Sequence, residues 1–588
     1  TSLFAAISLI VGFLLALNAV LLTVPQRRRF IADLRLQGFD PRQVLLILCF
    51  EALALALIAS LLGVGLGYVL SHTLFDQVPA YLTFAFLVGP QQSVHLSMVL
   101  LAFGCGVLAT LAASLPPMLD LRSGRPADAV FREAEGGEGM GQRAVHRLAL
   151  TGLTLVAAVT VLVLLGPSLT IVGLVLLAFA TLCLIPAVAQ IVVDGLARLV
   201  EHVRGGMLFV AVTELRASTT RSMALAGVAA LAIYGSVSIG GARHDLTRGL
   251  NAAVTQYLAS ADIWVTRGES VFTTESFHGG GAAVRALSRV AGVSSVRIYQ
   301  GGLLDVGKRR LWIRARPPQD NPILQSSQML QGEFARAQRQ IRSGPWAAIS
   351  EGLAKELHLH LGQSFMLPTP SGPVRFSLAA LTTNTGWAPG AITINTTQYA
   401  RYWHSSDPAA LEVNLKSGAR PAVVRRSIQA ALKDNGALRV QTVPEREAEL
   451  DANARQGLRA LGEISTLLLI AAALAVACAL SAAIWQRRPR LASLNISGLN
   501  YRQLWQALLL ESTIVLAVGC IVGALLGLYG HALANRFLQL TTGFPAPFSV
   551  GWLQVLLTLA LVGGIALAVI ALPGLAAARV SPRAGFKE

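Results

Sequence analysis

A short segment of this sequence occurs twice. One copy begins at Gln26 and reads QRRRFIADLRLQGFDPRQVLLILCFEA, and the other begins at Gln486 and reads QRRPRLASLNISGLNYRQLWQALLLES. Aligned without a gap, they match at Arg27, Arg28, Leu34, Gly38, Arg42, Gln43 and Glu51, and at Arg487, Arg488, Leu494, Gly498, Arg502, Gln503 and Glu511. Each copy lies between two long apolar runs, so the repeat predicts two equivalent membrane half-units that present the same segment to the same compartment.

The composition indicates an integral membrane protein. Hydrophobic residues make up 54% of the chain and charged residues only 13%, whereas a soluble protein carries about 25% charged residues. The formal net charge of +17 would suit a nucleic-acid-binding protein. The arginines lie next to apolar runs, however, where membrane topology places them, so we exclude nucleic acid as a partner.

Nine apolar stretches are long enough to cross a bilayer, which takes about 20 residues. They are approximately 2–24, 44–70, 94–115, 145–165, 169–193, 220–241, 462–485, 504–530 and 552–578. Only Gly166, Pro167 and Ser168 separate the fourth from the fifth, which predicts a tight hairpin.

The short loops predict the orientation. Arginine-rich segments follow the first, third, fifth, seventh and ninth spans, whereas 71–93 has no Lys or Arg and 530–551 has only Arg536. The arginine-rich side is cytoplasmic by the positive-inside rule. We therefore expect a multi-pass membrane protein with its C-terminus in the cytoplasm and Thr1 outside.

The long segment 243–461 then falls outside the cell. It contains strand-like runs at 261–265 and 309–315 and a helix-like run at 421–432. These patterns predict a compact α+β domain.

The expected fold is a mainly α-helical polytopic membrane protein with two repeated units and one extracytoplasmic α+β domain. The second unit has a span before its outer domain and three spans after it, whereas the first has only the last three, so we expect the missing parts to precede Thr1. The predicted divisions are a first unit 1–130, a linker and transmembrane hairpin 131–200, an interfacial helix and span 201–242, the outer domain 243–461 and a second unit 462–588.

The repeated segment resembles the FtsX-like permease family, the membrane subunits of MacB/LolCDE-type ABC transporters. Both copies fit that family's pattern R-R-x-x-x-x-x-L-x-x-x-G-x-x-x-x-Q between two spans. Segments 123–130 and 580–585 resemble the family's short Arg-Pro tail, and 349–368 resembles a phrase of its extracytoplasmic module. The two-unit layout is similar to the ten-span branch of the family.

This resemblance implies that the repeated segments are coupling helices that dock into a cytoplasmic ABC ATPase dimer. The implied coupling residues are Arg27, Arg28, Arg29, Leu34, Arg35, Gly38, Arg42, Gln43, Arg487, Arg488, Leu494, Gly498, Arg502 and Gln503. The residues alone also fit an amphipathic anchor on the membrane surface, with Gly38 and Gly498 as helix stops. We favour docking because the Gly and Gln positions recur in both copies.

The chain is not expected to be an enzyme or to hold a cofactor. Gly302–Arg309 fits G-x-x-x-x-G-K, but Arg309 stands where Ser or Thr must bind Mg²⁺, so ATP and Mg²⁺ are expected in the partner ATPase. His358 and His360 are interpreted as surface residues. We expect no metal site and no disulfide, because Cys49, Cys105, Cys183, Cys478 and Cys520 all lie in apolar runs without a C-x-x-C pair.

Two acids and two sets of glycines lie within the predicted spans. Glu51 and Glu511 are intramembrane acids at matching positions, interpreted as partners of Arg42 and Arg502 rather than as proton carriers. The glycines have the spacing of close helix packing and are Gly63, Gly65, Gly67, Gly519, Gly523 and Gly527.

The resulting interpretation is a permease subunit that uses ATP hydrolysis in its partner to move the spans 2–24, 220–241 and 462–485 and, through them, the outer domain. The resemblance implies export, or extraction from the membrane, of a hydrophobic, lipid-linked or peptide substrate, with membrane lipid and an extracytoplasmic protein as further partners. An alternative is a regulator that transports nothing and acts on an extracytoplasmic cell-wall enzyme. An ion-coupled transporter is a third class, supported only by Glu51 and Glu511.

Overall fold

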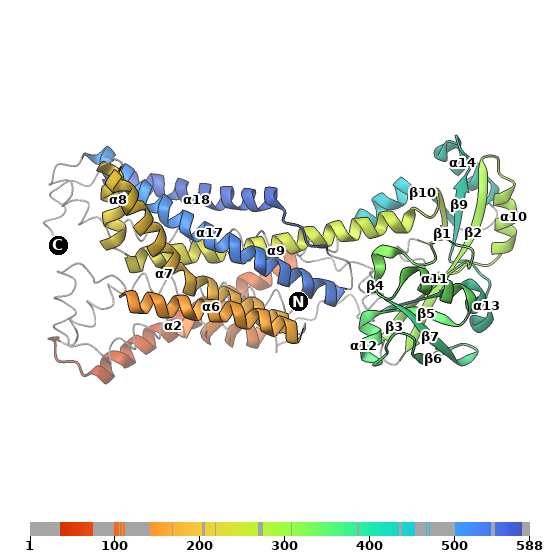
Figure 1. Ribbon diagram of the computed structural model, residues 1–588, viewed down its shortest axis with the longest axis horizontal. Helices are drawn as coiled ribbons and strands as arrows, with labels where there is room; N and C mark the ends of the chain where they lie inside the picture. The colour runs from red at the N-terminus through yellow and green to blue at the C-terminus, as the bar shows by residue number, and fades with distance from the viewer. Residues whose placement is uncertain are drawn as a thin grey trace.

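The computed structural model consists of a helical bundle and a β-sheet domain, joined by one long helix (Figure 1). It describes Leu34, residues 36–74, 99–104, 106–108, 110–111, 141–166, 169–202, 206–217, 219–268, 275–306, 309–320, 322–384, 387, 389–433, 438–452, 466, 470, 500–542 and 547–578. We call residues 261–442 the sheet domain. The end of the bundle that faces it is the domain end, and the opposite end is the far end.

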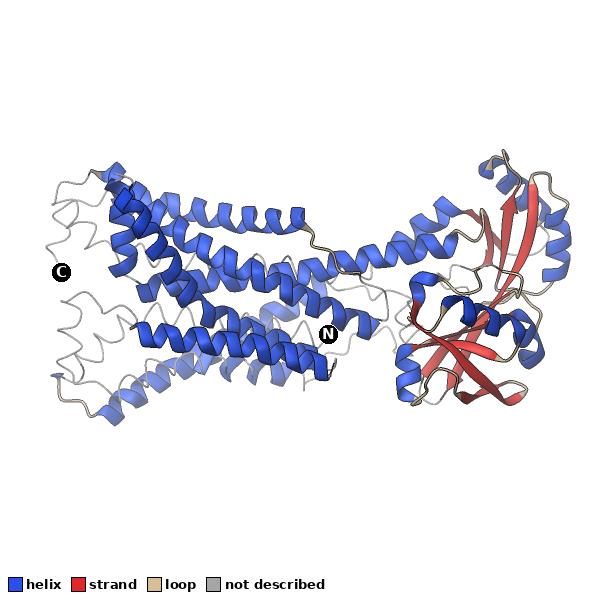
Figure 2. Cartoon of the chain, viewed as in Figure 1, coloured by secondary structure: helices blue, strands red, loops and turns tan. Residues whose placement is uncertain are grey.

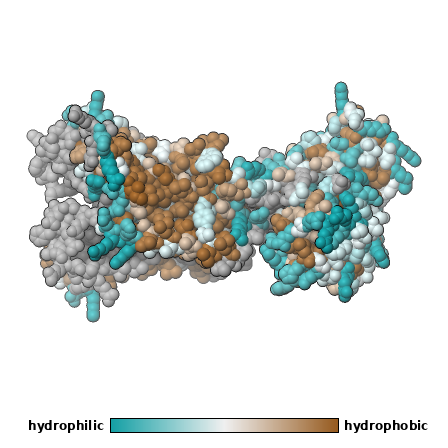
Figure 3. Space-filling model, viewed as in Figure 1, coloured by the Kyte–Doolittle hydropathy of each residue, from teal (hydrophilic) through white to brown (hydrophobic). Residues whose placement is uncertain are grey.

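Long apolar helices form the bundle. They are α2 (Pro41–Leu74), α6 (Gln142–Leu165), α7 (Thr170–His202), α9 (Thr219–Leu258), α17 (Tyr501–Thr542) and α18 (Trp552–Ala578), with the shorter α8 (Gly206–Ala217) between α7 and α9. Within the described residues, five helices are long and apolar enough to cross a membrane: 42–69, 142–164, 170–200, 225–252 and 501–539. Apolar side chains cover much of the bundle surface that is in view in Figure 3.

The predicted spans can be compared with these helices one by one. The spans at 44–70, 145–165, 169–193, 220–241, 504–530 and 552–578 coincide with helices, and part of 94–115 forms a short apolar helix at Val99–Leu108. The spans at 2–24 and 462–485 lie outside the described residues, apart from Thr466 and Ile470. Helix α6 ends at Leu165 and α7 begins at Thr170, and the Leu169 amide donates to the Gly166 carbonyl at 3.1 Å, an arrangement that fits the predicted hairpin.

Helix α9 is much longer than the predicted span 220–241. It has 40 residues, so at 1.5 Å per residue it measures about 60 Å, twice the thickness of a bilayer core. It continues through 242–243, where we expected a division between span and outer domain, and carries the sheet domain at its end (Figure 2). Apolarity ends near residue 241, but no proline follows before Leu258, so the helix does not end where the apolar run does.

The sheet domain alternates strands and helices. Its strands are β1 (Ile263–Arg267), β2 (Val293–Val306), β3 (Arg309–Arg316), β4 (Met329–Gln331), β5 (Trp346–Ser350), β6 (Ser364–Thr369), β7 (Gly372–Thr382), β8 (Ala391–Asn395), β9 (Ala410–Leu415) and β10 (Leu438–Thr442). Its helices are α10 (Gly280–Ser288), α11 (Phe334–Ser343), α12 (Glu351–Glu356), α13 (Thr396–Trp403) and α14 (Pro421–Ala431). The strand-like runs at 261–265 and 309–315 correspond to β1 and β3, and the helix-like run at 421–432 to α14.

The strands form one mixed sheet in the order β10-β1-β9-β2-β3-β8-β5-β7-β4, with β6 beside β7. The pairs β3–β8 and β5–β7 are parallel and the others are antiparallel. Strand β2 has 14 residues and pairs with β9 along its first half and with β3 along its second. It therefore links two lobes, each with its own apolar core, one around Ile263 and Val413 and the other around Ile313 and Phe376.

Candidate functional site

The two copies of the repeated segment lead into helices that begin at the same end of the bundle. Helix α2 begins at Pro41 and α17 at Tyr501. In Figure 1 both starts lie at the far end, away from the sheet domain. This agrees with the expectation that the two segments face one compartment.

Both helices also begin with the same hydrogen bond. The Asp40 amide donates to Gln43 Oε1 at 3.1 Å, and the Asn500 amide donates to Gln503 Oε1 at 2.9 Å. A Gln at the third helical position that reaches back to the N-cap amide is half of a capping box. The repeated glutamine therefore has a local structural role in each copy, and its recurrence does not by itself require a docking partner.

A glycine ends the helical turn that precedes α2. Gly38 has φ +93°, a conformation that favours glycine, and the Phe39 amide donates to the Leu34 carbonyl at 3.1 Å. Leu34 packs on Val44 and Leu48 of α2. Leu34 and the turn at Gly38 thus lie against the start of α2, and the left-handed Gly38 fits the helix-stop interpretation.

Of the remaining implied coupling residues, Arg42 and Arg502 lie within the described residues, in the first turns of α2 and α17. Both are exposed, and Arg502 Nε donates to Tyr501 Oη at 3.1 Å. A cation at a helix N-terminus opposes the helix dipole, so these arginines do not stabilise their own helices. Outside the described residues lie Arg27, Arg28, Arg29, Arg35, Arg487, Arg488, Leu494 and Gly498.

Helices α9 and α17 pack along a line of glycines on α17. A β-carbon on Gly519 would lie 2.5 Å from the Ala226 carbonyl oxygen, and one on Gly523 would overlap the backbone of Ala230. Close packing is therefore confirmed for Gly519, Gly523 and Gly527. We call this contact the glycine seam. For Gly63, Gly65 and Gly67 no described atom lies within 4 Å, and close packing there stays a prediction.

Two hydrogen bonds accompany the seam. Ser238 Oγ of α9 donates to the Gly527 carbonyl of α17 at 3.1 Å, and Tyr234 Oη of α9 donates to the Leu174 carbonyl of α7 at 2.8 Å. Side-chain bonds to carbonyls within apolar helices fix the rotation of one helix against another. Helix α9 is thereby held by both neighbours.

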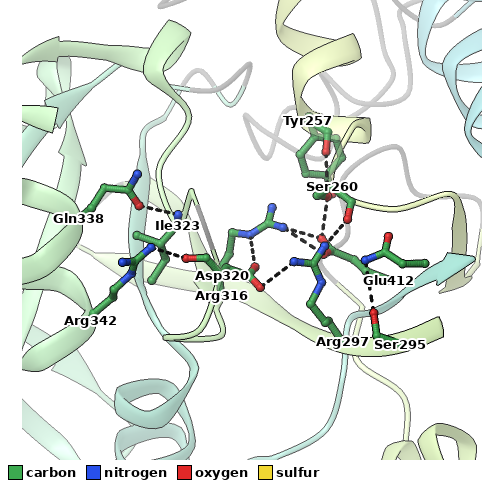
Figure 4. Close-up of polar contacts among 11 residues, drawn as sticks. Tyr257, Ser260, Ser295, Arg297, Arg316, Asp320, Ile323, Gln338, Arg342 and Glu412 are labelled. Atoms are coloured by element: carbon green, nitrogen blue, oxygen red, sulfur yellow. Dashed lines mark hydrogen bonds and ion pairs between the residues drawn. The ribbon is translucent and has the colours of Figure 1, made fainter. Parts of the chain in front are cut away.

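A buried ion network lies where α9 enters the sheet domain (Figure 4). Arg316 Nε donates to Asp320 at 3.0 Å, and an Arg316 terminal nitrogen donates to Glu412 at 2.8 Å. Arg297 donates to Asp320 at 3.1 Å. Burial alone would lower the pKa of Arg316, but the carboxylates of Glu412 and Asp320 outweigh it and raise that pKa. Arg316 is therefore held as a cation in a buried place.

The network joins both lobes to the end of α9. Arg316 ends β3, Arg297 lies on β2 and Glu412 on β9. Ser260, two residues after α9, donates through Oγ to Glu412 at 3.1 Å, and its carbonyl accepts from Arg297. Removing one member of such a network would leave a buried charge unpaired, so the network stiffens the joint between helix and domain.

The two intramembrane acids have different surroundings. Glu51 is exposed on α2, whereas Glu511 is only 4% exposed on α17. Their pairing with Arg42 and Arg502 stays a prediction.

The other sequence candidates behave as surface or packing residues. Gly302–Arg309 belongs to β2, β3 and their connection, not to the strand–loop–helix unit of a phosphate loop. His358 and His360 are exposed, and among the described residues no cluster of three or more His, Cys, Asp or Glu could hold a metal. Cys183 and Cys520 are free thiols.

Sequence reasoning missed a buried polar pair, Asp245 on α9 and His531 on α17. Their side chains are 2.9 Å apart although they are separated by 286 positions in the chain. Asp245 lies just beyond the predicted end of its span, so it was interpreted as part of the outer domain. An acid and a histidine at the edges of apolar helices were the only signal available.

Comparison with known proteins gives two informative results. The model of the FtsX-like permease C-terminal domain matches residues 2–126 and 464–582. An uncharacterized ABC transporter permease protein of Mycobacterium tuberculosis, Rv0987, is 24% identical over 547 residues, which cover 88% of this chain and 62% of that protein. The chain thus spans less than two thirds of this relative.

A solved structure also matches the chain. The extracellular domain of the noncanonic ABC-type transporter YknZ from Gram-positive bacteria covers 31% of this chain and 99% of its own, with 11% identity and a TM-score of 0.22. At that TM-score we infer nothing further from it. Two segments of this chain thus match the FtsX-like permease C-terminal domain, and 88% of the chain is similar to an ABC transporter permease, so the chain is a membrane protein that resembles these permeases.

Proposed function

We propose that the chain is the permease subunit of an ABC transporter and that it passes work from a separate cytoplasmic ATPase dimer to the sheet domain outside the cell. The observation that carries this proposal is a continuous path of packed helices. Helix α17 begins within the second repeated segment and packs on α9 along the glycine seam, and α9 continues into the sheet domain. ATP and Mg²⁺ belong to the partner.

The orientation in the proposal comes from the arginine distribution. The far end of the bundle, where α2 and α17 begin, is cytoplasmic by the positive-inside rule, and the sheet domain lies outside a bacterial inner membrane. The C-terminus is then cytoplasmic. The ATPase would approach the far end.

The segments 26–43 and 486–503 are the proposed docking elements. Their glutamines and the glycine at Gly38 have local structural roles, so the arginines are the better candidates for direct contact with the ATPase. Arg42 and Arg502 are exposed and gain nothing from their own helix dipoles, which is expected of residues kept for an external acidic partner.

In this proposal, the movement that the ATPase drives passes along α17 and α9 to the sheet domain. A push on 486–503 enters α17 directly, because α17 starts within that segment. The glycine seam passes it to α9, and the buried network around Arg316 and Glu412 passes it to both lobes of the sheet domain. This refines the expectation of a moving span at 220–241, because α9 and α17 would move together.

The cargo in this proposal is a hydrophobic, lipid-linked or peptide substrate that is exported or extracted from the membrane. The relative's designation as an ABC transporter permease favours transport. The second candidate is a regulator of an extracytoplasmic cell-wall enzyme, which would use the same helices. Membrane lipid contacts the apolar outside of the bundle in both cases.

Docking can be tested by co-purifying the chain with candidate ABC ATPases from the same genome and measuring affinity in nanodiscs. We expect Arg42→Glu combined with Arg502→Glu to weaken binding at least about tenfold, about 1.4 kcal/mol. Arg536→Glu is the matched control, because Arg536 is equally exposed on α17 but near its other end. Wild-type affinity in the double variant would contradict docking at these segments.

A further inference from the structure

The carboxylate of Asp245 is the centre of a buried cluster at the domain end of the bundle. Oδ2 accepts from His531 Nε2 at 2.9 Å, from Asn535 Nδ2 at 2.9 Å and from the Ser549 amide at 3.0 Å. Oδ1 accepts from Ser549 Oγ at 2.8 Å and from Arg248 at 2.7 Å. We call these five residues the Asp245 clasp.

The clasp connects three elements. Asp245 and Arg248 lie on α9, His531 and Asn535 on α17, and Ser549 in the segment that crosses α9 before α18 (Figure 1). Arg248 also donates to the Pro547 carbonyl at 3.1 Å. The clasp therefore ties the continuous helix α9 to α17 and to the entry of α18 at one level of the bundle.

The backbone of α9 is adapted to this contact. One turn before Asp245, a β-carbon on Gly241 would lie 2.5 Å from His531 Nδ1, so glycine leaves the room that the imidazole occupies. The centroids of the His531 and Phe548 rings lie 4.9 Å apart. The imidazole thus contacts both α9 and the segment before α18.

Donors occupy all the acceptor positions of the Asp245 carboxylate. Its side chain has no exposed surface, and the five donors take up the roughly four lone-pair positions of its two oxygens. The titratable groups around it are His531 on α17 and Arg248 and His244 on α9 itself. The half-exposed Arg248 supplies the compensating charge. This arrangement fits a fixed anionic anchor better than a proton carrier.

The glycine seam brings α9 and α17 close together, but a further contact such as this anchor is needed to fix their relative position. Its contacts are between small residues and backbone, and dispersion contacts of this kind favour closeness without fixing how far one helix slides or turns on the other. Hydrogen bonds are directional. The directional contacts between α9 and α17 include the Ser238–Gly527 bond and the clasp.

We propose that the Asp245 clasp is the joint that makes α9 and α17 one rigid lever, with Asp245 and His531 as positioning residues for the movement that the ATPase drives. This inference rests on the proposed function. Without the clasp, α17 would move under ATPase force while α9 slipped along the seam. The sheet domain would then no longer follow the nucleotide state.

The test measures distances by pulsed electron resonance in the chain–ATPase complex, on a background in which all five cysteines are replaced. One label pair joins Lys433 on the sheet domain to Leu164 on α6, two exposed positions on opposite sides of the proposed movement. A second pair joins Lys433 to the exposed Arg536 on α17. We expect the 433–164 distance to change when nucleotide is trapped, and the 433–536 distance to stay single and constant.

In Asp245→Asn, an NH₂ group replaces one carboxylate oxygen. This group cannot accept the hydrogen bonds that the oxygen accepted, and it faces other donors instead. We expect ATPase binding and turnover within about twofold of the wild type, loss of the nucleotide-dependent change at 433–164, and a broadened 433–536 distance. Asn251→Ala is the control, since Asn251 is exposed on the same helix. A wild-type response from Asp245→Asn would overturn the joint.

A second pair of variants separates positioning from folding. The amide of His531→Gln can still donate toward Asp245, whereas the side chain of His531→Leu cannot. We expect the His531→Gln variant to keep most of the nucleotide-dependent change in the 433–164 distance. We expect the His531→Leu variant to lose that change at similar ATPase turnover. Equal behaviour of Gln and Leu would contradict the joint. Absence of ATPase binding, or of any distance change in the wild type, would instead contradict the proposed function.

Discussion

Gln43 and Gln503 accept the same backbone hydrogen bond at the start of two different helices. Gln43 Oε1 receives the Asp40 amide at 3.1 Å, and Gln503 Oε1 receives the Asn500 amide at 2.9 Å. The relationship links two parts of the chain that are remote in sequence. It also changes the meaning of the repeat, because part of the conserved spacing between copies serves the helix start itself.

We therefore expect Gln503→Ala to destabilise the start of α17 without weakening the ATPase complex. The cost should be about 0.5–1 kcal/mol, the usual effect of losing a capping contact. Amide exchange at Asn500 should accelerate, and Gln503→Glu should restore it because Glu accepts the same bond. A tenfold loss of ATPase affinity in Gln503→Ala would show that the glutamine contacts the partner directly.

The glycine seam predicts a strong position effect along the membrane helices. Gly523→Ala places a methyl group against the Ala230 backbone, so it should destabilise the bundle by about 1–3 kcal/mol. Gly564→Ala on α18 has no described atom within 4 Å of the new methyl and should be neutral or slightly stabilising. Thermal unfolding in detergent compares the two. Equal melting temperatures would mean that α9 and α17 are not in close contact.

The network at the end of α9 predicts that breaking a buried ion pair lowers the free energy of unfolding more than breaking an exposed one. Glu412→Gln removes one carboxylate from Arg316 and should cost about 3 kcal/mol, because a buried cation loses a partner. Asp305→Asn breaks the exposed pair with Arg310 and should cost less than about 1 kcal/mol. Denaturant unfolding of the full chain, followed by tryptophan fluorescence, measures both. A smaller cost for Glu412→Gln than for Asp305→Asn would contradict this network.

Glu445 predicts an acid-sensitive contribution to stability. The Thr442 amide donates to its carboxylate at 2.9 Å, and this bond together with Arg425 holds the pKa of Glu445 below its usual value. A lowered pKa in the folded state means that the stabilisation is complete above the unfolded pKa, near 4.3, and is lost as the pH falls through the folded value. Glu445→Gln should therefore flatten the decline in unfolding free energy below about pH 5. An unchanged slope would argue against this bond.

The proposed orientation predicts a labelling pattern in intact cells. Cysteines at Arg42 and Arg502 should react only with reagents that enter the cytoplasm, and one at Lys433 should react with an impermeant maleimide outside. The single-cysteine variants need a background without the native thiols. Labelling of positions 42 and 502 from opposite sides would remove the basis for a shared ATPase contact.

Local patterns predicted much of the fold. Apolar runs located the helices, because about 20 apolar residues suit a bilayer and little else. The strands β1 and β3 and the helix α14 were also predicted, since their alternation or helical periodicity is a property of a few neighbouring residues. The order of the sheet was not predicted, because β1 pairs with β9 and β10, far along the chain.

Some of the functional residues were likewise predicted from local sequence, and others were not. Gly38 as a helix stop and Gly519, Gly523 and Gly527 as a packing face were predicted from spacing within one segment. The capping role of Gln43 and Gln503 was not predicted, although the amides that they bind are local. The recurrence of both glutamines was interpreted as contact with the ATPase.

By itself, the sequence determined that this chain is a membrane protein, where most of its spans lie and which family it resembles, since these depend on apolar length and short motifs. Tertiary structure alone decided that α9 continues into the sheet domain, that Arg316 meets Glu412 and that Asp245 meets His531. Such contacts join residues far apart in the chain. They form only when packing brings the helices and strands together and removes water from between their polar groups.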